Sequence, residues 1–215
     1  TRAGQPLLSF AQRLPGAGAV LEAITGFDRR RPLPQFTRSW STGYRERGVG
    51  THPVVLFADT FNNWMEPGNL DAAAKVLQAS GHRVIVARAP DARPLCCGRT
   101  YLSAGMMDEA RVNARRTLAA LAPHLERGTP VLGLEPSCLF TFRDEYPAMF
   151  PGDALVARLA QAAQLADEYL AAGLAQGTLS LPWRGADPQS IRVHGHCHQK
   201  AFGTFEATLS LLRAI

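Results

Sequence analysis

The sequence predicts an α/β fold, a parallel sheet with flanking helices. Three short apolar segments, at residues 54–57, 82–87 and 129–134, have the length and composition of buried strands. Helical segments separate them, and strands that alternate with helices form parallel sheets through right-handed crossovers. Ligands of such sheets bind beyond the C-terminal ends of the strands. The loops that follow these three strands are therefore the expected functional region.

The helices between the strands are predicted from caps and periodicity. Asn69 or Asp71 can cap a helix over residues 70–80, which Gly81 ends. A longer helix is predicted over residues 106–127, because apolar residues recur there near a period of 3.6. These residues are Val112, Leu118, Leu121 and Leu125. Further along, the pattern predicts a helix over 153–172, a strand over 191–193 and a helix from about residue 202 onward.

Three regions are expected along the chain. Residues 1–52 are rich in Gly, Pro and Arg, and prolines interrupt short helical pieces at 7–14 and 19–26, so this stretch predicts a linker from an upstream domain. Residues 53–150 form the first α/β unit. Residues 151–215 repeat its strand-then-polar-loop layout, which indicates an internal duplication cut off partway. The first residue is not Met, and both ends resemble cuts in a longer protein.

Composition excludes several classes of protein. The chain has 215 residues, 46% of them hydrophobic, which suffices for a buried core. No apolar run approaches the roughly 20 residues that cross a bilayer, and the N-terminus lacks the layout of a signal peptide, so we expect a cytoplasmic protein. The net charge is +5, but the strongest basic cluster, Arg29 to Arg31, has no interleaved aromatics and predicts a solvated linker, not a nucleic-acid site.

The four cysteines predict a metal or cluster site better than a disulfide. Cys96 and Cys97 are adjacent, and neighbouring cysteines rarely bond to each other because the ring is strained. Gly98 follows them and permits a sharp turn that directs both sulfurs to one side. Cys138 ends the next strand segment, so a parallel sheet places it beside this loop. The alternative is that Cys96 and Cys97 are buried thiols that act as small hydrophobic residues.

Three histidines surround the fourth cysteine. In an extended segment His194, His196 and His198 share one face, with Cys197 opposite. Zinc accepts both Cys and His ligands, so a zinc site is one interpretation. The other is that these rings orient a cluster or donate hydrogen bonds to its sulfurs. The remaining histidines, at positions 52, 82 and 124, stand at element edges and are expected to be solvated.

The polar residues near the same strand ends have either a ligand-binding role or a structural role. Asp59, Asn62 and Asn63 follow the first strand and either bind an anionic or polar group or cap the next turn. Arg99, directly after the cysteine pair, either pairs with a carboxylate substrate or has Glu135 as a structural partner.

The motifs carry a family resemblance. The strings LFADTFNNWMEPGNL, RPLCCGRTYLSAGMMDEA, GLEPSC and HGHCHQKAFG resemble the cysteine-rich CCG domain of heterodisulfide reductase subunits, glycolate oxidase iron–sulfur subunits and lactate-utilisation proteins. The resemblance extends over about residues 27–215. It is strongest to the C-terminal part of large bacterial proteins in which an FAD-binding dehydrogenase of the D-lactate or 2-hydroxyglutarate type is fused to such a domain.

The resemblance implies two CCG-type repeats, at 53–150 and, incomplete, at 151–215. In the family each repeat holds a [4Fe–4S] cluster through one Cys after the first strand, the CCG pair and a CxxC. It assigns cofactor binding to Cys96, Cys97, Cys138 and Cys197. The implied function is an electron-transfer fragment of a flavin-dependent 2-hydroxyacid dehydrogenase. Electrons pass from FAD in an upstream domain to a quinone or another carrier, with peripheral association at the inner membrane.

The sequence departs from this pattern at two ligand positions. Asp59 and Thr60 stand where the family has its first cysteine, and Thr141 replaces the second cysteine of CxxC. The first repeat thus retains three thiols, so its cluster is lost or altered, or the thiols have become a substrate or packing site. Cys197 matches the first cysteine of the second repeat, whose CCG and CxxC would lie beyond residue 215. We therefore expect a full cluster only in the full-length protein and not in this fragment alone. The alternative function is a cluster-free scaffold that joins the flavin domain to an iron–sulfur repeat; thiol catalysis is disfavoured because no resolving CxxC is present.

Overall fold

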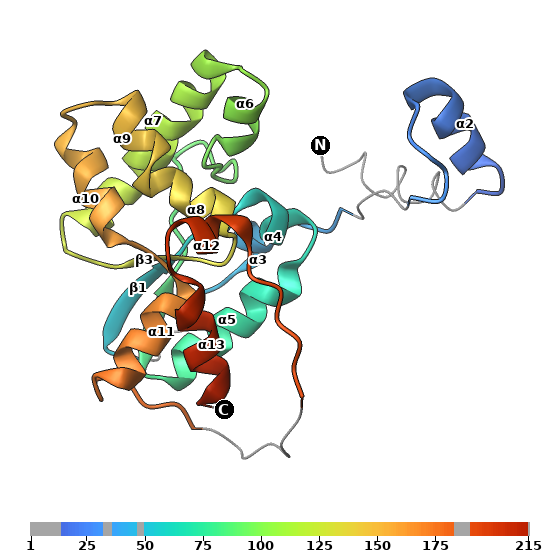
Figure 1. Cartoon of the computed structure of the whole chain (residues 1–215). Coiled ribbons are helices and arrows are strands. Elements are labelled where there is room, and N and C mark those ends of the chain that lie inside the picture. Colours follow the sequence, from blue (N-terminus) through green and yellow to red (C-terminus); the bar gives the residue numbers. More distant parts are fainter. Residues whose placement is uncertain (1–13, 32–35, 47–49, 183–189, 215) are drawn as a thin grey trace.

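The computed structural model describes residues 14–31, 36–46, 50–182 and 190–214, and its centre is a parallel sheet (Figure 1). The strands are β1 (His52–Leu56), β2 (His82–Ile85), β3 (Val131–Gly133) and β4 (Ala163–Leu165), in the order β2-β1-β3-β4. Val55 pairs with both Ile85 and Val131, and Val131 also pairs with Ala163. The predicted α/β fold with a parallel sheet is confirmed.

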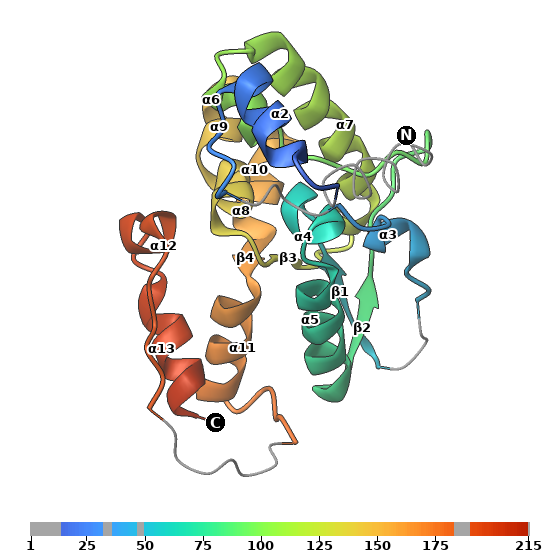
Figure 2. The same ribbon diagram turned by 90° about the vertical axis from the view of Figure 1, so that its right-hand side faces the viewer.

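Helices cover both faces of the sheet (Figures 1 and 2). One face packs against α7 (Met107–Leu125), α8 (Pro136–Arg143), α9 (Glu145–Met149) and α10 (Ala154–Ala162). The other packs against α5 (Pro67–Ala79) and α11 (Ala166–Ala175). Successive residues of a strand point to opposite faces, so Val55 and Phe57 enter the first core while Val54 and Leu56 enter the second. The result is a sheet between two helical layers.

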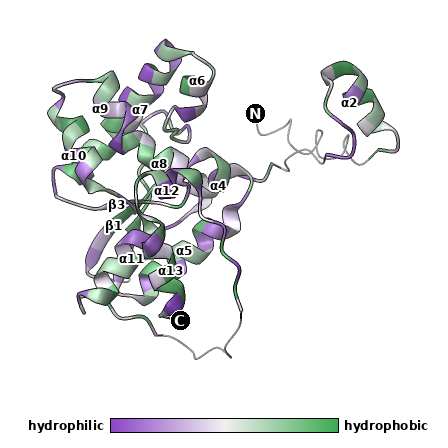
Figure 3. Cartoon of the chain, viewed as in Figure 1, coloured by the Kyte–Doolittle hydropathy of each residue, from purple (hydrophilic) through white to green (hydrophobic). Residues whose placement is uncertain are grey.

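Six shorter or peripheral helices complete the described chain. They are α2 (Ala17–Thr25), α3 (Trp40–Gly43), α4 (Thr60–Trp64), α6 (Arg99–Ser103), α12 (Cys197–Ala201) and α13 (Phe205–Arg213). Figure 1 shows α2 apart from the rest, and Figure 3 shows that it nevertheless carries strongly hydrophobic positions. Helix α13 lies beside α11 in both views. Among the described residues, no helix combines the length and apolar character needed to cross a membrane.

Two details of the predicted helices are wrong. Helix α5 begins at Pro67, and its N-cap is Glu66 and not Asn69 or Asp71. Proline favours the first helical position because its φ is already helical and its missing N–H would have no partner there. In α7, Leu118, Leu121 and Leu125 are buried as expected, but Val112 is 67% exposed. Val112 departs from the helical spacing of the three buried leucines, so its side chain lies on the solvent side of the helix.

The helix predicted over 153–172 is two helices with a strand between them. Residues 163–165 pair with β3, with Ala163 and Leu165 buried and Gln164 between them half-buried. The surrounding sequence is alanine-rich and favours helix, so the pairing with β3 overrides the local propensity. Residues of the predicted second unit thus belong to the same sheet as the first.

The strand predicted at residues 191–193 is not formed. These residues are outside any strand ladder, and Ile191 and Val193 are 62% and 38% exposed. A strand needs a neighbouring strand for its backbone hydrogen bonds. The interpretation of residues 151–215 as an incomplete second repeat stays a prediction. Near the N-terminus, α2 falls close to the expected 19–26 segment, whereas most of 7–14 lies outside the described residues.

Candidate cysteine site at the strand ends

Three sulfurs meet beyond the C-terminal ends of β2 and β3. The Cys97 thiol is within hydrogen-bonding reach of both the Cys96 thiol and the Cys138 thiol. Cys96 and Cys97 follow β2 in a loop, and Cys138 lies in the first turn of α8, directly after β3. The expectation that the parallel sheet gathers these residues at one edge is confirmed. Their role as ligands stays a prediction.

The turn at Gly98 directs two backbone N–H groups at the sulfurs. Gly98 has a φ of 85°, and a Cβ added there would lie 3.2 Å from the carbonyl oxygen of Ala110. Both facts favour glycine. The N–H of Gly98 donates to Cys96 Sγ and the N–H of Arg99 donates to Cys97 Sγ, each at 3.4 Å. Such donors stabilise negative charge on sulfur.

Side chains from two distant helices hold the cysteine loop. Thr117 Oγ1 on α7 donates to the carbonyl oxygen of Cys96 at 2.8 Å, and the Tyr146 hydroxyl on α9 donates to that of Cys97 at 3.0 Å. Thr117 and Tyr146 are fully buried. Sequence reasoning missed both, because no local pattern marks a contact between residues so far apart in the chain.

The environment of Cys96 and Cys97 keeps their thiols protonated. The neighbouring Cys97 thiol and burial raise the pKa of Cys96, and the neighbouring Cys138 thiol and burial raise the pKa of Cys97. Burial, with the nearby thiols, also raises the pKa of Tyr146. A thiol with a raised pKa is a poor nucleophile, whereas a metal ion would remove its proton on binding. Nucleophilic chemistry by these two thiols is therefore disfavoured.

Asp59 and Asn62 cap and brace helix α4. Asp59 Oδ1 accepts hydrogen bonds at 3.0 Å from the N–H groups of Phe61 and Asn62, and Oδ2 accepts one at 2.7 Å from Asn62 Nδ2. The Asn63 amide oxygen accepts from the N–H of Ser41 at 2.8 Å. These bonds correspond to the capping interpretation. Asp59 is 1% exposed, and this burial raises the pKa of its carboxyl.

Two threonines, Thr60 and Thr141, lie close to the cysteines. Thr60 follows the Asp59 cap and hydrogen-bonds with the Cys96 thiol. Thr141 lies one turn after Cys138 on α8, is fully buried, and donates from Oγ1 to the Ser137 carbonyl oxygen at 2.8 Å. Both threonines bring neutral hydroxyls to the surroundings of the cysteines.

Arg99 pairs with a residue that the sequence did not indicate. Its guanidinium forms an ion pair with Glu145, the first residue of α9. The expected partner, Glu135, instead caps α8: its Oε1 accepts from Ser137 N at 3.1 Å and from Ser137 Oγ at 2.6 Å. Glu145 thus fixes α9, which carries Tyr146, to the residue after the CCG motif.

The histidines around Cys197 are arranged differently from the extended-strand expectation. The chain enters helix α12 at Cys197, so the sulfur lies 3.9 Å from His196 Nδ1 and 3.5 Å from His198 Nδ1 instead of on the opposite face. His194 is exposed. The pKa of His198 is lowered, mainly by burial and then by the positive charge of Arg99.

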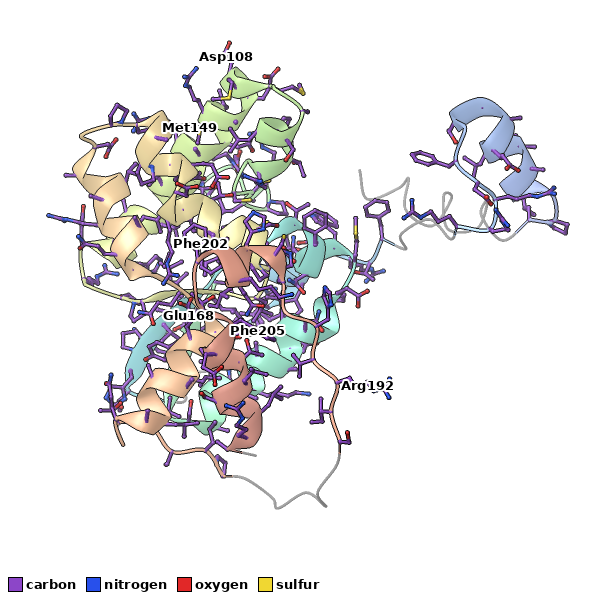
Figure 4. All side chains as sticks on the ribbon, viewed as in Figure 1. Asp108, Met149, Glu168, Arg192, Phe202 and Phe205 are labelled. Carbon is purple, nitrogen blue, oxygen red and sulfur yellow. The ribbon has the colours of Figure 1, made fainter. Side chains whose placement is uncertain are left out.

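This histidine group lies next to the cysteine edge. His196 Nε2 is 3.8 Å from Glu135 Oε1. Phe202, at the end of α12 (Figure 4), stacks on Phe140 of α8 with 4.4 Å between ring centroids. His82, expected to be solvated, is buried: its ring nitrogens hydrogen-bond with Ser80 Oγ at 2.9 Å and with the Tyr169 hydroxyl at 2.8 Å.

Comparison with known proteins gives relatives in one enzyme system. The sequence is 28% identical over 216 residues to a subunit of the anaerobic glycerol-3-phosphate dehydrogenase of Escherichia coli strain K12, and equally to the same protein of strain O157:H7. It is similar to a dehydrogenase subunit. The aligned part is 98% of this chain and 52% of each relative, so the chain spans about half the length of the curated relatives it matches. No family model matches, and no solved structure does. The similarity supports a general role in an oxidoreductase.

Proposed function

We propose that this chain is an electron-transfer component of a dehydrogenase and that Cys96, Cys97 and Cys138 hold an iron–sulfur cluster. The observation that carries the proposal is the meeting of these three sulfurs at the ends of parallel strands, with backbone N–H groups aimed at two of them. The similarity to a dehydrogenase subunit supports the redox role.

The residues fit three thiolate ligands of a four-iron cluster. Burial of Cys97 and Cys138 limits water, and the N–H groups of Gly98 and Arg99 stabilise anionic sulfur, two features that tune cluster potentials. Thr141 cannot supply a fourth thiolate. One iron would therefore take a ligand from elsewhere, and the bound cluster would supply one-electron transfer.

The redox partners belong to the same proposal. Reduced FAD in a domain before residue 1 would be the electron donor, linked through residues 1–52, and a quinone or another carrier would be the acceptor. By the motif resemblance, the substrate that the enzyme oxidises is a 2-hydroxyacid. The relatives are named for glycerol-3-phosphate, which is also a secondary alcohol with a neighbouring anionic group. Peripheral attachment to the inner membrane would bring the chain to a quinone.

Iron and acid-labile sulfide analysis tests the proposal. The full-length protein, purified without oxygen and reconstituted with iron and sulfide, should carry both. Cys97→Ser and Cys138→Ser should each lower both contents severalfold, while Cys197→Ser, a matched control outside the three-sulfur site, should not.

The absence of iron and sulfide from the reconstituted full-length protein would overturn the proposal and favour the cluster-free scaffold. Thr141 gives this second function a specific basis, because its hydroxyl already has a partner within α8. Unchanged iron content in both variants would likewise exclude these cysteines as ligands. Far-UV circular dichroism of each variant separates loss of the cluster from loss of the fold.

A further inference from the structure

His196, Cys197 and His198 bring three metal-binding atoms together. One atom from each residue lies within 4.8 Å of the other two, which holds for no other group of His, Cys, Asp and Glu in the described part of the chain. Cys197 Sγ is 3.5 Å from His198 Nδ1 and 3.9 Å from His196 Nδ1. The two rings are stacked, with 5.2 Å between centroids.

These separations match a tetrahedral zinc site. With Zn–S about 2.3 Å and Zn–N about 2.0–2.1 Å, tetrahedral angles separate a sulfur and a nitrogen ligand by about 3.6 Å. The observed S–N distances of 3.5 and 3.9 Å are close to this value, and the two stacked rings would rotate to direct both nitrogens at one ion. A mixed sulfur and imidazole set favours zinc over magnesium or calcium, which prefer oxygen.

Glu135 is placed to orient one of the ligands. When a histidine binds metal through one nitrogen, its other N–H usually donates to a carboxylate, which fixes the ring. His196 Nε2 lies 3.8 Å from Glu135 Oε1. Metal binding at His196 Nδ1 would displace one contact, the hydrogen bond that Nδ1 accepts from the His198 N–H at 3.2 Å.

The segment is held in place by contacts outside the ligand set. Phe202 stacks on Phe140, and Gln199 Nε2 donates to Asp167 Oδ2 at 3.1 Å and to Thr208 Oγ1 at 3.0 Å. Cys197 is exposed, so an ion reaches the site from solvent and keeps a fourth position open. A fixed site costs less entropy on binding than one that must be ordered.

We propose that His196, Cys197 and His198 bind one zinc-type divalent ion and that Glu135 is a positioning residue for His196. The site is separate from the three-sulfur site of Cys96, Cys97 and Cys138, and it is an alternative to the expectation that Cys197 is a cluster ligand. Metal bound there ties the start of α12, through Glu135, to the end of β3.

Titration of the chelator-treated chain with Zn²⁺ and with Co²⁺ tests this proposal. We expect one high-affinity Zn²⁺ per chain in calorimetry. Co²⁺ should show a thiolate charge-transfer band and the intense visible bands of tetrahedral coordination. Cys197→Ser should abolish the charge-transfer band that arises from this site, and His198→Gln should weaken binding at least tenfold. Glu135→Gln, which keeps an acceptor for the α8 cap, should weaken it about tenfold.

His194→Gln is the matched control, because this exposed neighbour belongs to the same segment and should leave affinity unchanged. Zn²⁺ affinity and Co²⁺ spectra that are the same in Cys197→Ser and in the unaltered chain would overturn the proposal. So would iron and labile sulfide that are lost specifically on Cys197→Ser. Failure here leaves the iron content that depends on Cys97 and Cys138 unaffected, so the two proposals fail independently.

Discussion

Replacing Tyr146 with Phe removes one oxygen and leaves the surrounding packing in place. The hydroxyl donates to the Cys97 carbonyl at 3.0 Å, and the side chain has 0% exposure. The ring packs edge-on against Phe142, a contact that phenylalanine keeps. A buried carbonyl that loses its partner costs about 1–3 kcal/mol. We therefore expect Tyr146→Phe to lower the free energy of unfolding by about 2 kcal/mol.

Urea unfolding and thiol labelling measure this effect. The unfolding midpoint should fall at an unchanged slope with denaturant. Cys97 should react faster with a thiol reagent under native conditions, since its loop opens more often. Tyr169→Phe is the matched control: its hydroxyl bonds to His82 at 2.8 Å away from the cysteines, so stability should fall while labelling stays constant.

The reasoning is refuted if Tyr146→Phe changes stability by less than about 0.5 kcal/mol and leaves Cys97 labelling unchanged. The carbonyl would then be satisfied by another donor, and the hydroxyl would not hold the loop.

Three further predictions address the capping residue, the buried histidine and the turn. Asp59→Ala removes the acceptor of three hydrogen bonds and should cost about 1–2 kcal/mol in urea unfolding, whereas Ala at the exposed Asp108 should cost little. Burial lowers the pKa of His82 below its usual value of 6.5, so the unfolded chain binds a proton at this histidine at a higher pH than the folded chain does. The contribution of neutral His82 to the free energy of unfolding should therefore be complete above pH 6.5 and should fall as the pH drops below 6.5. His82→Gln should flatten this slope, and an unchanged slope would contradict the assignment. Gly98→Ala places a Cβ 3.2 Å from the Ala110 carbonyl oxygen at a φ of 85° and should cost about 1–2 kcal/mol, with faster labelling of Cys97. Gly105→Ala, whose added Cβ meets nothing within 4 Å, separates the positive φ from the close contact.

The strands at β1, β2 and β3 were predictable because each is short, apolar and bounded by turn residues. Strand β4 was not, because its residues lie inside an alanine-rich stretch and become a strand only through pairing with β3. Propensity describes a residue in isolation, while the sheet edge supplies hydrogen bonds that only the folded chain has.

The meeting of the three sulfurs was also predictable, since topology alone fixes which loops share an edge of a parallel sheet. Their supports were not. Tyr146, Thr117 and Glu145 reach the CCG loop from helices far along the chain, and nothing in their local sequence marks the contact. The prediction for the histidines was wrong for a different reason. It assumed an extended segment, in which side chains alternate with a period of two, but a helix with 3.6 residues per turn begins at Cys197.

The direct passage from α10 through β4 to α11 leaves no spare residue between the two helical layers. One added residue at this junction would rotate α11 by about 100° about its axis, because an α-helix has 3.6 residues per turn. It would also exchange the buried and half-buried positions of the strand. Leu170, Asp167 and the packing of α13 depend on that rotation. An insertion or deletion at this junction would therefore change the rotation of α11 relative to the sheet and to the helices on the other face.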